Sequence, residues 1–549
     1  MNLVCLAGLA LAAWLAVRGR RTAESAGATG PLRAALDSRW IVWVLAAATA
    51  AIVWWYWGLL HPLPVVQDEF AYVLQARIFA SGRWTAPSPP LPQFFEQAHV
   101  LVVPALAAKY PPGYSFVLAV GALVRWLPLV PLLLAGATAA LLFVLARRAA
   151  GGAVALLTWV LWLSSPMVQR FAAGYYSESL TTVCWLAGWL ALLEWRSTGR
   201  TRWLLVLALV TGLGAISRPL TMLAYAVPIG VVVLGDTFRS GRWRPLLAAM
   251  GTGMLVLAIL PLWSARTTGH WNVSPVALYT RQYMPWDVPG FGYNATAPER
   301  AVPADLVALG RLFEPMHRLH LPVTMPVILE LRVGFLLRNV WGAATAVLMP
   351  LAVLGLCALG GEALFAAASA VLLVLAYLVY AAAPAWTLYY YEIVPVIAFV
   401  TAVGVGVVAS AARGGVDWRA RLRGWGRPSL VPAVAAAVLC FAVPGIRTAR
   451  FARSSHRGEV AYRTEFARIL GTLHQPAVLF VRYAPDHSPH TSLVRNSPDL
   501  ANDPVWVVYD RGAAENARLL ALVPRRATYL YDEVRRGIFP YDVRNPANR

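Results

Sequence analysis

Two adjacent carboxylates are the residues of this chain best suited to acid–base chemistry. Asp68 and Glu69 lie in the segment QDEFAY, which follows a long apolar run. A carboxylate held near a hydroxyl can accept its proton as the oxygen attacks a carbon atom. Neighbouring residues do not share a helix face, so we expect the two acids to have different tasks. The alternative is that both are solvated residues at the end of an apolar segment.

A single lysine is the second candidate. Lys109 is the only lysine in the chain, and it lies in the segment AKYPPGY. Pro111 and Pro112 fix the backbone there, and Gly113 permits close approach. An ammonium held by such a segment can bind a phosphate. The alternative is a lysine that only extends its ammonium to a membrane interface.

Further cations, acids and tyrosines lie in short turns between later apolar runs. They are Arg170, Tyr175, Glu178, Arg218 and Tyr390, and the first loop adds Tyr72 and Tyr110. Together they suit a sugar carried on a polyprenyl phosphate, which combines an apolar tail, an anionic phosphate and a polar ring. Cations matter most as the phosphate departs, because charge then grows on its oxygens.

The composition indicates the scaffold that must position these residues. Of 549 residues, 59% are hydrophobic and 13% are charged, whereas soluble domains average about 45–50% apolar and about 25% charged residues. We therefore predict an α-helical polytopic membrane protein with about 11–13 spans. The candidate spans are 3–17, 40–60, 128–146, 153–168, 178–195, 203–217, 220–235, 246–264, 341–359, 362–380, 393–412 and 430–447.

The arginines predict how the spans are oriented. Arginine-rich turns follow alternate apolar runs, and all fall on one side if every run crosses the membrane, which identifies that side as cytoplasmic. The other side receives a large first extracytoplasmic loop (61–127), a further outer loop (265–340) and a C-terminal segment (448–549). The net charge of +21 is thus explained by topology, and we expect no nucleic-acid partner.

The C-terminal segment differs in character from the rest. Three short apolar stretches, 477–483, 505–510 and 527–533, alternate with helical patterns. The pattern predicts a small α/β domain over 448–549, after a transmembrane domain over 1–447. Asp486, His487 and His490 also resemble a metal cluster within this segment.

These motifs resemble those of the GT-C class of membrane glycosyltransferases, especially its dolichyl-phosphate-mannose–protein mannosyltransferase, aminoarabinose transferase and glycosyltransferase family 39 group. Asp68, Glu69 and Tyr72 look like the catalytic motif of the class, and AKYPPGY resembles its Lys-Pro-Pro segment. RFAAGYYSESL is similar to the second outer loop of oligosaccharyltransferase catalytic subunits.

The resemblance implies a GT-C-like helical bundle and a role for each candidate residue. Asp68 and Glu69 would be catalytic, and Lys109, Arg170 and Arg218 would bind the donor phosphate. The expected substrate-binding residues are Tyr72, Tyr110, Tyr175, Glu178 and Tyr390. Either no cofactor is needed, or a divalent cation (Mg²⁺ or Mn²⁺) binds Asp68 and Glu178. Ser177 stands where the related pattern has an Asp, which weakens the metal site.

The expected function is inverting transfer of a sugar from a polyprenyl-phosphate donor to a lipid, glycan or protein acceptor on the extracytoplasmic face. An Arg-rich, Lys-poor chain indicates a GC-rich bacterial genome, and we expect the chain in a bacterial inner (plasma) membrane. Two alternatives remain open: a transporter or flippase for a lipid-linked sugar or polysaccharide, and an envelope scaffold without catalysis. A transporter should keep ionisable residues at mid-membrane, whereas the predicted spans carry theirs at the ends.

Overall fold

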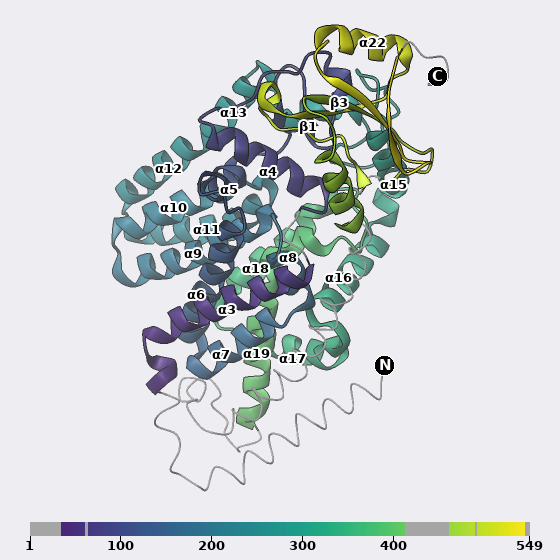
Figure 1. The fold of residues 1–549 in the computed structure, drawn as a ribbon. Helices are drawn as coiled ribbons and strands as arrows, with labels where there is room; N and C mark the ends of the chain where they lie inside the picture. Colours follow the sequence, from purple (N-terminus) through teal and green to yellow (C-terminus); the bar gives the residue numbers. More distant parts are fainter. Residues whose placement is uncertain (1–33, 61–63, 412–459, 489–490, 544–549) are drawn as a thin grey trace.

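The computed structural model describes residues 34–60, 64–411, 460–488 and 491–543 (Figure 1). Helices occupy every predicted span between 40 and 412, whereas 3–17 and 430–447 lie outside the described residues. The first helices are α3 (Trp40–Leu60), α6 (Leu129–Ala150), α7 (Gly152–Leu163), α8 (Pro166–Ala172), α9 (Ser177–Thr198), α10 (Thr201–Ala215) and α11 (Pro219–Ser240). The others are α12 (Trp243–Leu257), α13 (Ile259–Thr268), α17 (Thr345–Cys357), α18 (Gly361–Ala376) and α19 (Val394–Ala411).

Several of these helices could cross a membrane. Among the described residues, five are long and apolar enough by length and composition, or up to seven if each of two bent pairs is one span. The five are Trp40–Gly58, Leu129–Ala150, Pro219–Ser240, Trp243–Thr268 and Thr387–Val408. The predicted runs 203–217, 341–359 and 362–380 correspond to shorter apolar helices. The total of 11–13 spans therefore stays a prediction.

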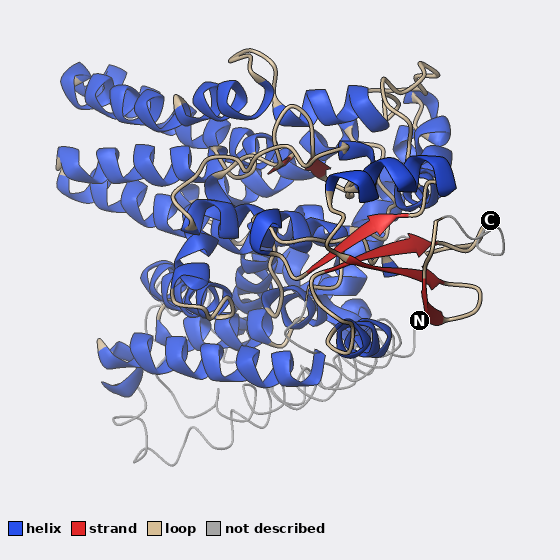
Figure 2. Cartoon of the chain, turned by 45° about the horizontal axis from the view of Figure 1, so that its top comes forward, coloured by secondary structure: helices blue, strands red, loops and turns tan. Residues whose placement is uncertain are grey.

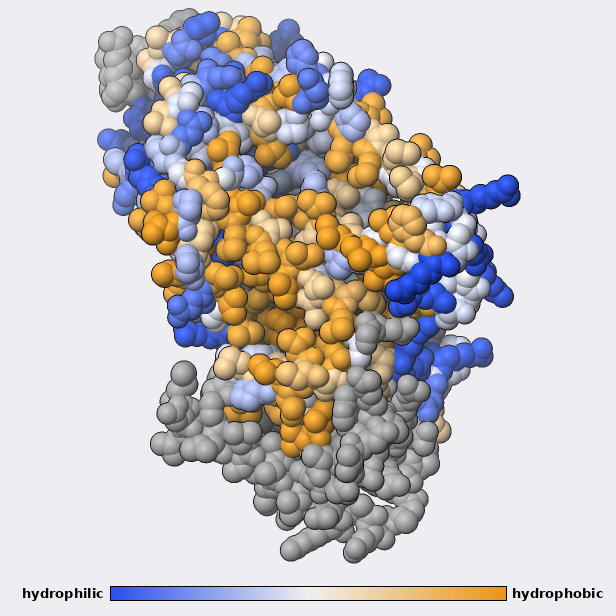
Figure 3. Space-filling view, turned by 180° about the vertical axis from the view of Figure 1, so that it is seen from behind, coloured by the Kyte–Doolittle hydropathy of each residue, from blue (hydrophilic) through white to orange (hydrophobic). Residues whose placement is uncertain are grey.

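The outer faces of these helices are apolar. Within Trp243–Thr268, an 18-residue window has a mean hydropathy of 2.0, yet only 11% of that window is buried. Its Met254 and Leu255 side chains are 64% and 76% exposed. Figure 3 shows a broad hydrophobic area across the back of the molecule, with hydrophilic residues gathered above it. Exposed apolar surface on this scale is typical of contact with lipid.

The helices α17 and α19 pack through small residues. An added Cβ at Gly355 would overlap the backbone carbonyl of Val400, and one at Gly404 would overlap that of Leu351. Only glycine permits backbones to approach this closely, as at many helix contacts in membranes.

The predicted outer loops are built largely from regular elements. The first contains α4 (Gln67–Ala80), the antiparallel pair β1 (Val100–Leu101) and β2 (Ala107–Ala108), and α5 (Gly113–Leu123). The predicted outer loop 265–340 contains α14 (Pro275–Tyr283), α15 (Ala304–Leu319) and α16 (Met325–Trp341). A bend of 85° separates α15 from the stretch Pro322–Trp341, and the two form one of the bent pairs.

The small C-terminal sheet is present as predicted. Its strands are β3 (Ala477–Arg482), β4 (Val505–Tyr509), β5 (Ala527–Asp532) and β6 (Gly537–Pro540), in the order β4-β3-β5-β6. Strand β3 is parallel to β4 and β5, and β6, which was not predicted, is antiparallel to β5. Residues 460–470 and α22 (Ala513–Leu522) are helical. The predicted domain boundary at 447/448 lies outside the described residues.

The sheet packs on the first loop. Phe94 and Phe95 of that loop share a hydrophobic core with Phe480 of β3 and Trp506 of β4. Figure 2 shows the strands at one end of the molecule, beside helices. The sheet and the loop that carries Asp68 therefore form one packed unit.

Candidate active site

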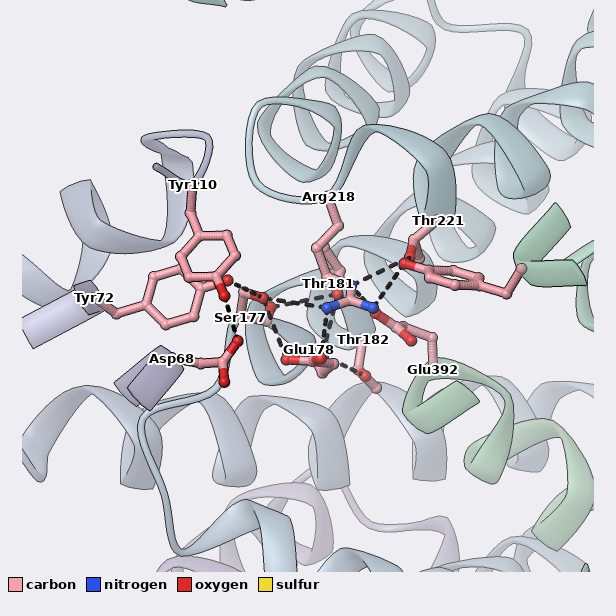
Figure 4. Close-up of polar contacts among 11 residues, drawn as sticks. Asp68, Tyr72, Tyr110, Ser177, Glu178, Thr181, Thr182, Arg218, Thr221 and Glu392 are labelled. Carbon is pink, nitrogen blue, oxygen red and sulfur yellow. Dashed lines mark hydrogen bonds and ion pairs between the residues drawn. The ribbon is translucent and has the colours of Figure 1, made fainter. Parts of the chain in front are cut away.

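Asp68 lies in the first turn of α4, where a carboxylate also stabilises the positive end of the helix dipole. Its Oδ1 accepts a hydrogen bond from the Tyr110 hydroxyl (Figure 4). Burial opposes the charged carboxylate, but His99, the Tyr110 hydroxyl and Lys109 together lower the pKa of Asp68 below its usual value. Asp68 is therefore ionised at neutral pH and, being half-buried, remains able to accept a proton.

Glu69 has a different environment, as its position next to Asp68 predicted. Its Oε2 accepts the backbone N–H groups of Val65 and Val66 at 2.8 and 3.1 Å, and its Oε1 accepts that of Tyr175 at 3.0 Å. Burial raises the pKa of Glu69, and these three bonds oppose that rise. The carboxylate holds the start of α4 against the turn before α9, which is a structural arrangement; its catalytic role stays a prediction.

Lys109 lies beside Asp68, as the sequence predicted. Its side chain is buried, and its ammonium is 4.8 Å from the centre of the Tyr279 ring and 5.5 Å from that of Tyr110. Burial lowers the pKa of Lys109, and the charges of Asp287 and Asp68 oppose this. Within the described part of the chain, the ammonium makes no hydrogen bond or ion pair. A buried cation without a bonded anion is costly, so the position suits an anionic ligand.

Two residues near Lys109 were missed by the sequence reasoning. His99 is buried with no hydrogen-bond partner for Nδ1 among the described residues, and its φ of 64° is left-handed. Burial and the nearby Lys109 lower the pKa of His99 to about 4, so its ring is neutral at pH 7. Asp287 interacts electrostatically with Lys109, and His317 lies 3.3 Å from its carboxylate. Neither residue stands in a recognisable motif, so no sequence signal marks them.

A second polar network joins Asp68's neighbours to the membrane helices. The Tyr72 hydroxyl donates to Ser177 at 3.0 Å, and Ser177 donates to Glu178 at 3.2 Å (Figure 4). Arg218 then pairs with Glu178 at 2.5 Å and with Glu392 at 3.3 Å. These residues come from α4, α9, the turn before α11 and the turn before α19. The structure thus confirms that turns predicted on one side of the membrane meet.

The network leaves Arg218 fully engaged. Besides the two carboxylates, its guanidinium donates to the Tyr377 hydroxyl at 2.7 Å and to Thr221 at 3.2 Å. Pro219 at the first helical position starts α11 directly after it. Two carboxylates already contact the guanidinium, so a phosphate would have to displace an ion pair. Phosphate binding by Arg218 stays a prediction.

Three further predicted residues have side chains in other surroundings. Arg170 is exposed at the end of α8, with its guanidinium 5.3 Å from the centre of the Phe171 ring. Tyr175 is buried, and its ring centre lies 5.3 Å from that of Trp57. Tyr390 is buried and its hydroxyl accepts from Arg332 at 3.4 Å. The structure does not bring Arg170 to Lys109, and the substrate-binding roles of the two tyrosines stay predictions.

The predicted metal sites have few ligands. No group of three or more His, Cys, Asp or Glu side chains that could hold a metal occurs among the described residues. Glu178 is paired with Arg218, and Asp68 with Tyr110. His487 instead bonds to Asp305 at 2.6 Å and to Glu533 at 2.9 Å, and His490 lies outside the described residues. The divalent cation stays a prediction.

An apolar cavity of about 420 Å³ lies in the helix bundle. Its lining comes mainly from α6, α9, α18 and α19, and includes Leu142, Leu186, Phe365 and Phe399. Pro395 and Val396 also line it, one helical turn beyond Glu392 of the polar network. The cavity can accept hydrocarbon but offers few polar partners.

The comparisons with known proteins identify the fold. The sequence matches no protein-family profile and no curated protein. The structure is similar to that of ArnT from Cupriavidus metallidurans bound to undecaprenyl phosphate, with a TM-score of 0.55 and 16% identity over 90% of this chain and 94% of ArnT. The apo state of ArnT gives a TM-score of 0.50 and 17% identity over 90% and 89% of the two chains. The chain therefore has the fold of a GT-C membrane glycosyltransferase of the aminoarabinose-transferase type, as the resemblance implied.

Proposed function

We propose that this chain transfers a sugar from a polyprenyl-phosphate donor to an acceptor hydroxyl, with inversion at the anomeric carbon. The observation that carries the proposal is the proximity of an ionised, half-buried carboxylate, Asp68, to a buried ammonium, Lys109, that has no bonded partner among the described residues, at one end of an apolar helix bundle. The first group suits a proton acceptor and the second an anionic leaving group.

The reaction follows from these two positions. The acceptor hydroxyl oxygen forms a bond to the anomeric carbon while its proton passes to Asp68. The bond between that carbon and the phosphate oxygen breaks, and its electron pair leaves with the polyprenyl phosphate. The phosphate gains negative charge at that moment, and the ammonium of Lys109 stabilises it more strongly than in the ground state. The neutral ring of His99 can donate a further hydrogen bond.

The lipid part of the donor fits the scaffold. Pro395 and Val396, one helical turn from Glu392, line the apolar cavity, which can receive part of an isoprenoid tail. ArnT, which shares the fold, was solved with undecaprenyl phosphate. We propose that membrane lipid surrounds the bundle, that the site opens on the extracytoplasmic face of a bacterial inner membrane, and that the acceptor is a lipid, glycan or protein.

The test is transfer by the purified chain in liposomes, supplied with radiolabelled polyprenyl-phosphate sugars and lipid or glycan acceptors. Asp68→Asn removes the proton acceptor with little change of shape and should abolish transfer. Glu314→Gln is a matched acid-to-amide control, because Glu314 lies on the surface of α15, where its carboxylate bonds to Arg318 and Tyr293. Full activity of Asp68→Asn would refute the assignment. Movement of lipid-linked sugar across the vesicle without any product would favour a transporter instead.

A further inference from the structure

Two arginines of the C-terminal part hold the segment that carries Asp68. Arg463, in the helix over residues 460–470, donates to the backbone carbonyls of Pro64 at 2.8 Å and Val65 at 3.1 Å. Arg495 donates to the Gln67 side chain at 3.0 Å. In Figure 1 this part of the chain lies directly beside α4. The contacts therefore join residues about 400 positions apart in the sequence.

Both guanidinium groups also lie over one ring. The Cζ atoms of Arg463 and Arg495 are 4.7 and 2.9 Å from the centre of the Phe70 ring. A cation over an aromatic face is attracted by its quadrupole, and the attraction is larger away from water. Phe70 follows Asp68 by two positions, so these contacts hold the first turn of α4 in addition to the backbone before it.

Glu69 bonds to the same backbone segment that Arg463 contacts. Its carboxylate accepts hydrogen bonds from the N–H groups of Val65 and Val66, while Arg463 donates to the carbonyls of Pro64 and Val65. The backbone leading into Asp68 is thus bonded on both sides. A shift of this backbone would separate Asp68 from the Tyr110 hydroxyl.

The charges of Arg463 and Arg495 indicate that these residues do more than hold the two parts of the chain together. Burial and the nearby charge of Arg463 lower the pKa of Arg495 well below its usual value. Two neighbouring cations in a buried contact cost stability, and apolar side chains would join the two parts at lower cost. A planar group with several donors instead fixes direction as well as distance.

The C-terminal part is also attached elsewhere, by contacts that do not involve residues 64–70. His487 bonds to Asp305 of α15, and Arg311 of α15 donates to the carbonyl of Pro485 at 2.8 Å. Phe94 and Phe95 pack against the sheet. Loss of an arginine contact at Phe70 should therefore leave the two parts docked, which separates positioning from assembly.

We propose that Arg463 and Arg495 are positioning residues for Asp68, so that the C-terminal α/β part completes the active site instead of only recruiting an acceptor. The inference rests on the proposed function for its kinetic consequences, but its structural content, the placement of Asp68 against Tyr110, can be measured without activity.

The first test is kinetic. Arg463→Lys and Arg495→Lys keep a basic side chain but lose the planar donor set, and the corresponding Met variants lose both. We expect kcat to fall roughly 10- to 100-fold with the donor KM nearly unchanged, because a displacement near 1 Å can cost about that much. The acid limb of the pH profile should move to higher pH as Asp68 loses the Tyr110 bond. Arg311→Ala is the matched control, and it should keep the wild-type profile.

The second test uses infrared spectroscopy on the unreacted protein. The carboxyl band lost in Asp68→Asn identifies Asp68, and its pH titration gives the pKa directly. The arginine variants should raise that pKa by roughly one unit. Unchanged titration and unchanged kcat in correctly folded variants would overturn the inference. A raised pKa in a protein that transfers no sugar would instead retain the inference and reject the proposed function.

Discussion

The Tyr110 hydroxyl donates to Asp68 and so helps to set the pH at which this carboxylate can accept a proton. Because the bond stabilises the ionised form, the pKa of Asp68 in Tyr110→Phe should rise. Activity that needs the ionised acid is present above this pKa and is lost as the pH falls through it, so the acid limb of kcat/KM should move upward. Tyr72→Phe is the control, since the Tyr72 hydroxyl donates to Ser177. An unmoved acid limb in Tyr110→Phe would contradict the role given to Asp68.

Lys109 should contribute mainly when the phosphate departs. Lys109→Met removes the charge and keeps most of the chain length, and we expect kcat to fall about 100-fold or more. Lys109→Arg should recover part of this loss, because it restores the charge with a broader, planar group. Single-turnover transfer measures the effect. A change confined to KM would show that the ammonium binds the ground state and the transition state equally.

Among individual residues, the type and spacing of side chains in the sequence predicted part of the site. Asp68 and Lys109 stand in short motifs that fix the backbone around them, and the structure places them together. Glu69 could not be distinguished from Asp68 in role, because its three backbone donors come from the folded turn and not from a pattern. His99 and Asp287 became visible only when folding brought them beside Lys109. Arg170 and Arg218 were equivalent span-end cations in the sequence, yet one is exposed and the other is paired.

Among the elements, α15 and the C-terminal sheet are joined by a titratable contact. His487 lies between Asp305 and Glu533, and although burial opposes its charge, the two carboxylates raise its pKa from 6.5 to about 9. The contact therefore contributes stability that is full below about pH 6.5 and is lost as the pH rises through about 9. The shift corresponds to on the order of 3 kcal/mol.

The prediction is that His487→Gln lowers the stability of this attachment at neutral pH and that the difference from wild type disappears above about pH 9. Limited proteolysis of residues 460–543 across a pH series would measure it. A constant difference at all pH values would show that His487 acts through packing alone.

The contact between α17 and α19 should tolerate no side chain at Gly404. Gly404→Ala places a Cβ against the carbonyl of Leu351, so the two helices must separate. We expect a loss of about 1–3 kcal/mol in unfolding free energy. Gly251→Ala in α12 is the control, because no atom lies within 4 Å of its added Cβ. Thermal unfolding in detergent would compare the two, and equal melting temperatures would contradict the close approach.

Hydrophobic length and periodicity predicted most elements, because apolar runs and alternating strands are set locally. All ten predicted spans between 40 and 412 contain helix, and three of the four C-terminal strands were anticipated. Helices α14, α15 and α16 were not, since their mixed composition gives no run of span length and their packing partners are distant in sequence. The short strand β6 forms by pairing with β5, and no local sequence pattern predicts that pairing.

Across the whole molecule, the arrangement places polar chemistry at one end of an apolar body and covers it with residues from both ends of the chain. The positive-inside rule assigned the turns that carry Glu178, Arg218 and Glu392 to one side, and the structure brings these three side chains together. The rule could not predict that the C-terminal sheet would pack on the first loop, since both lie outside the apolar runs and their contact is decided by the tertiary fold.

The single lysine of this protein offers a position for selective chemical labelling. Lys109 carries the only side-chain primary amine in the sequence, and burial lowers its pKa, so more of it is unprotonated and nucleophilic than an ordinary surface lysine. An acylating reagent small enough to enter should therefore modify one internal position. A bound phosphate would protect that amine from the reagent. The fraction of protein that is labelled therefore measures how much of the site a candidate donor occupies, even when that donor does not react.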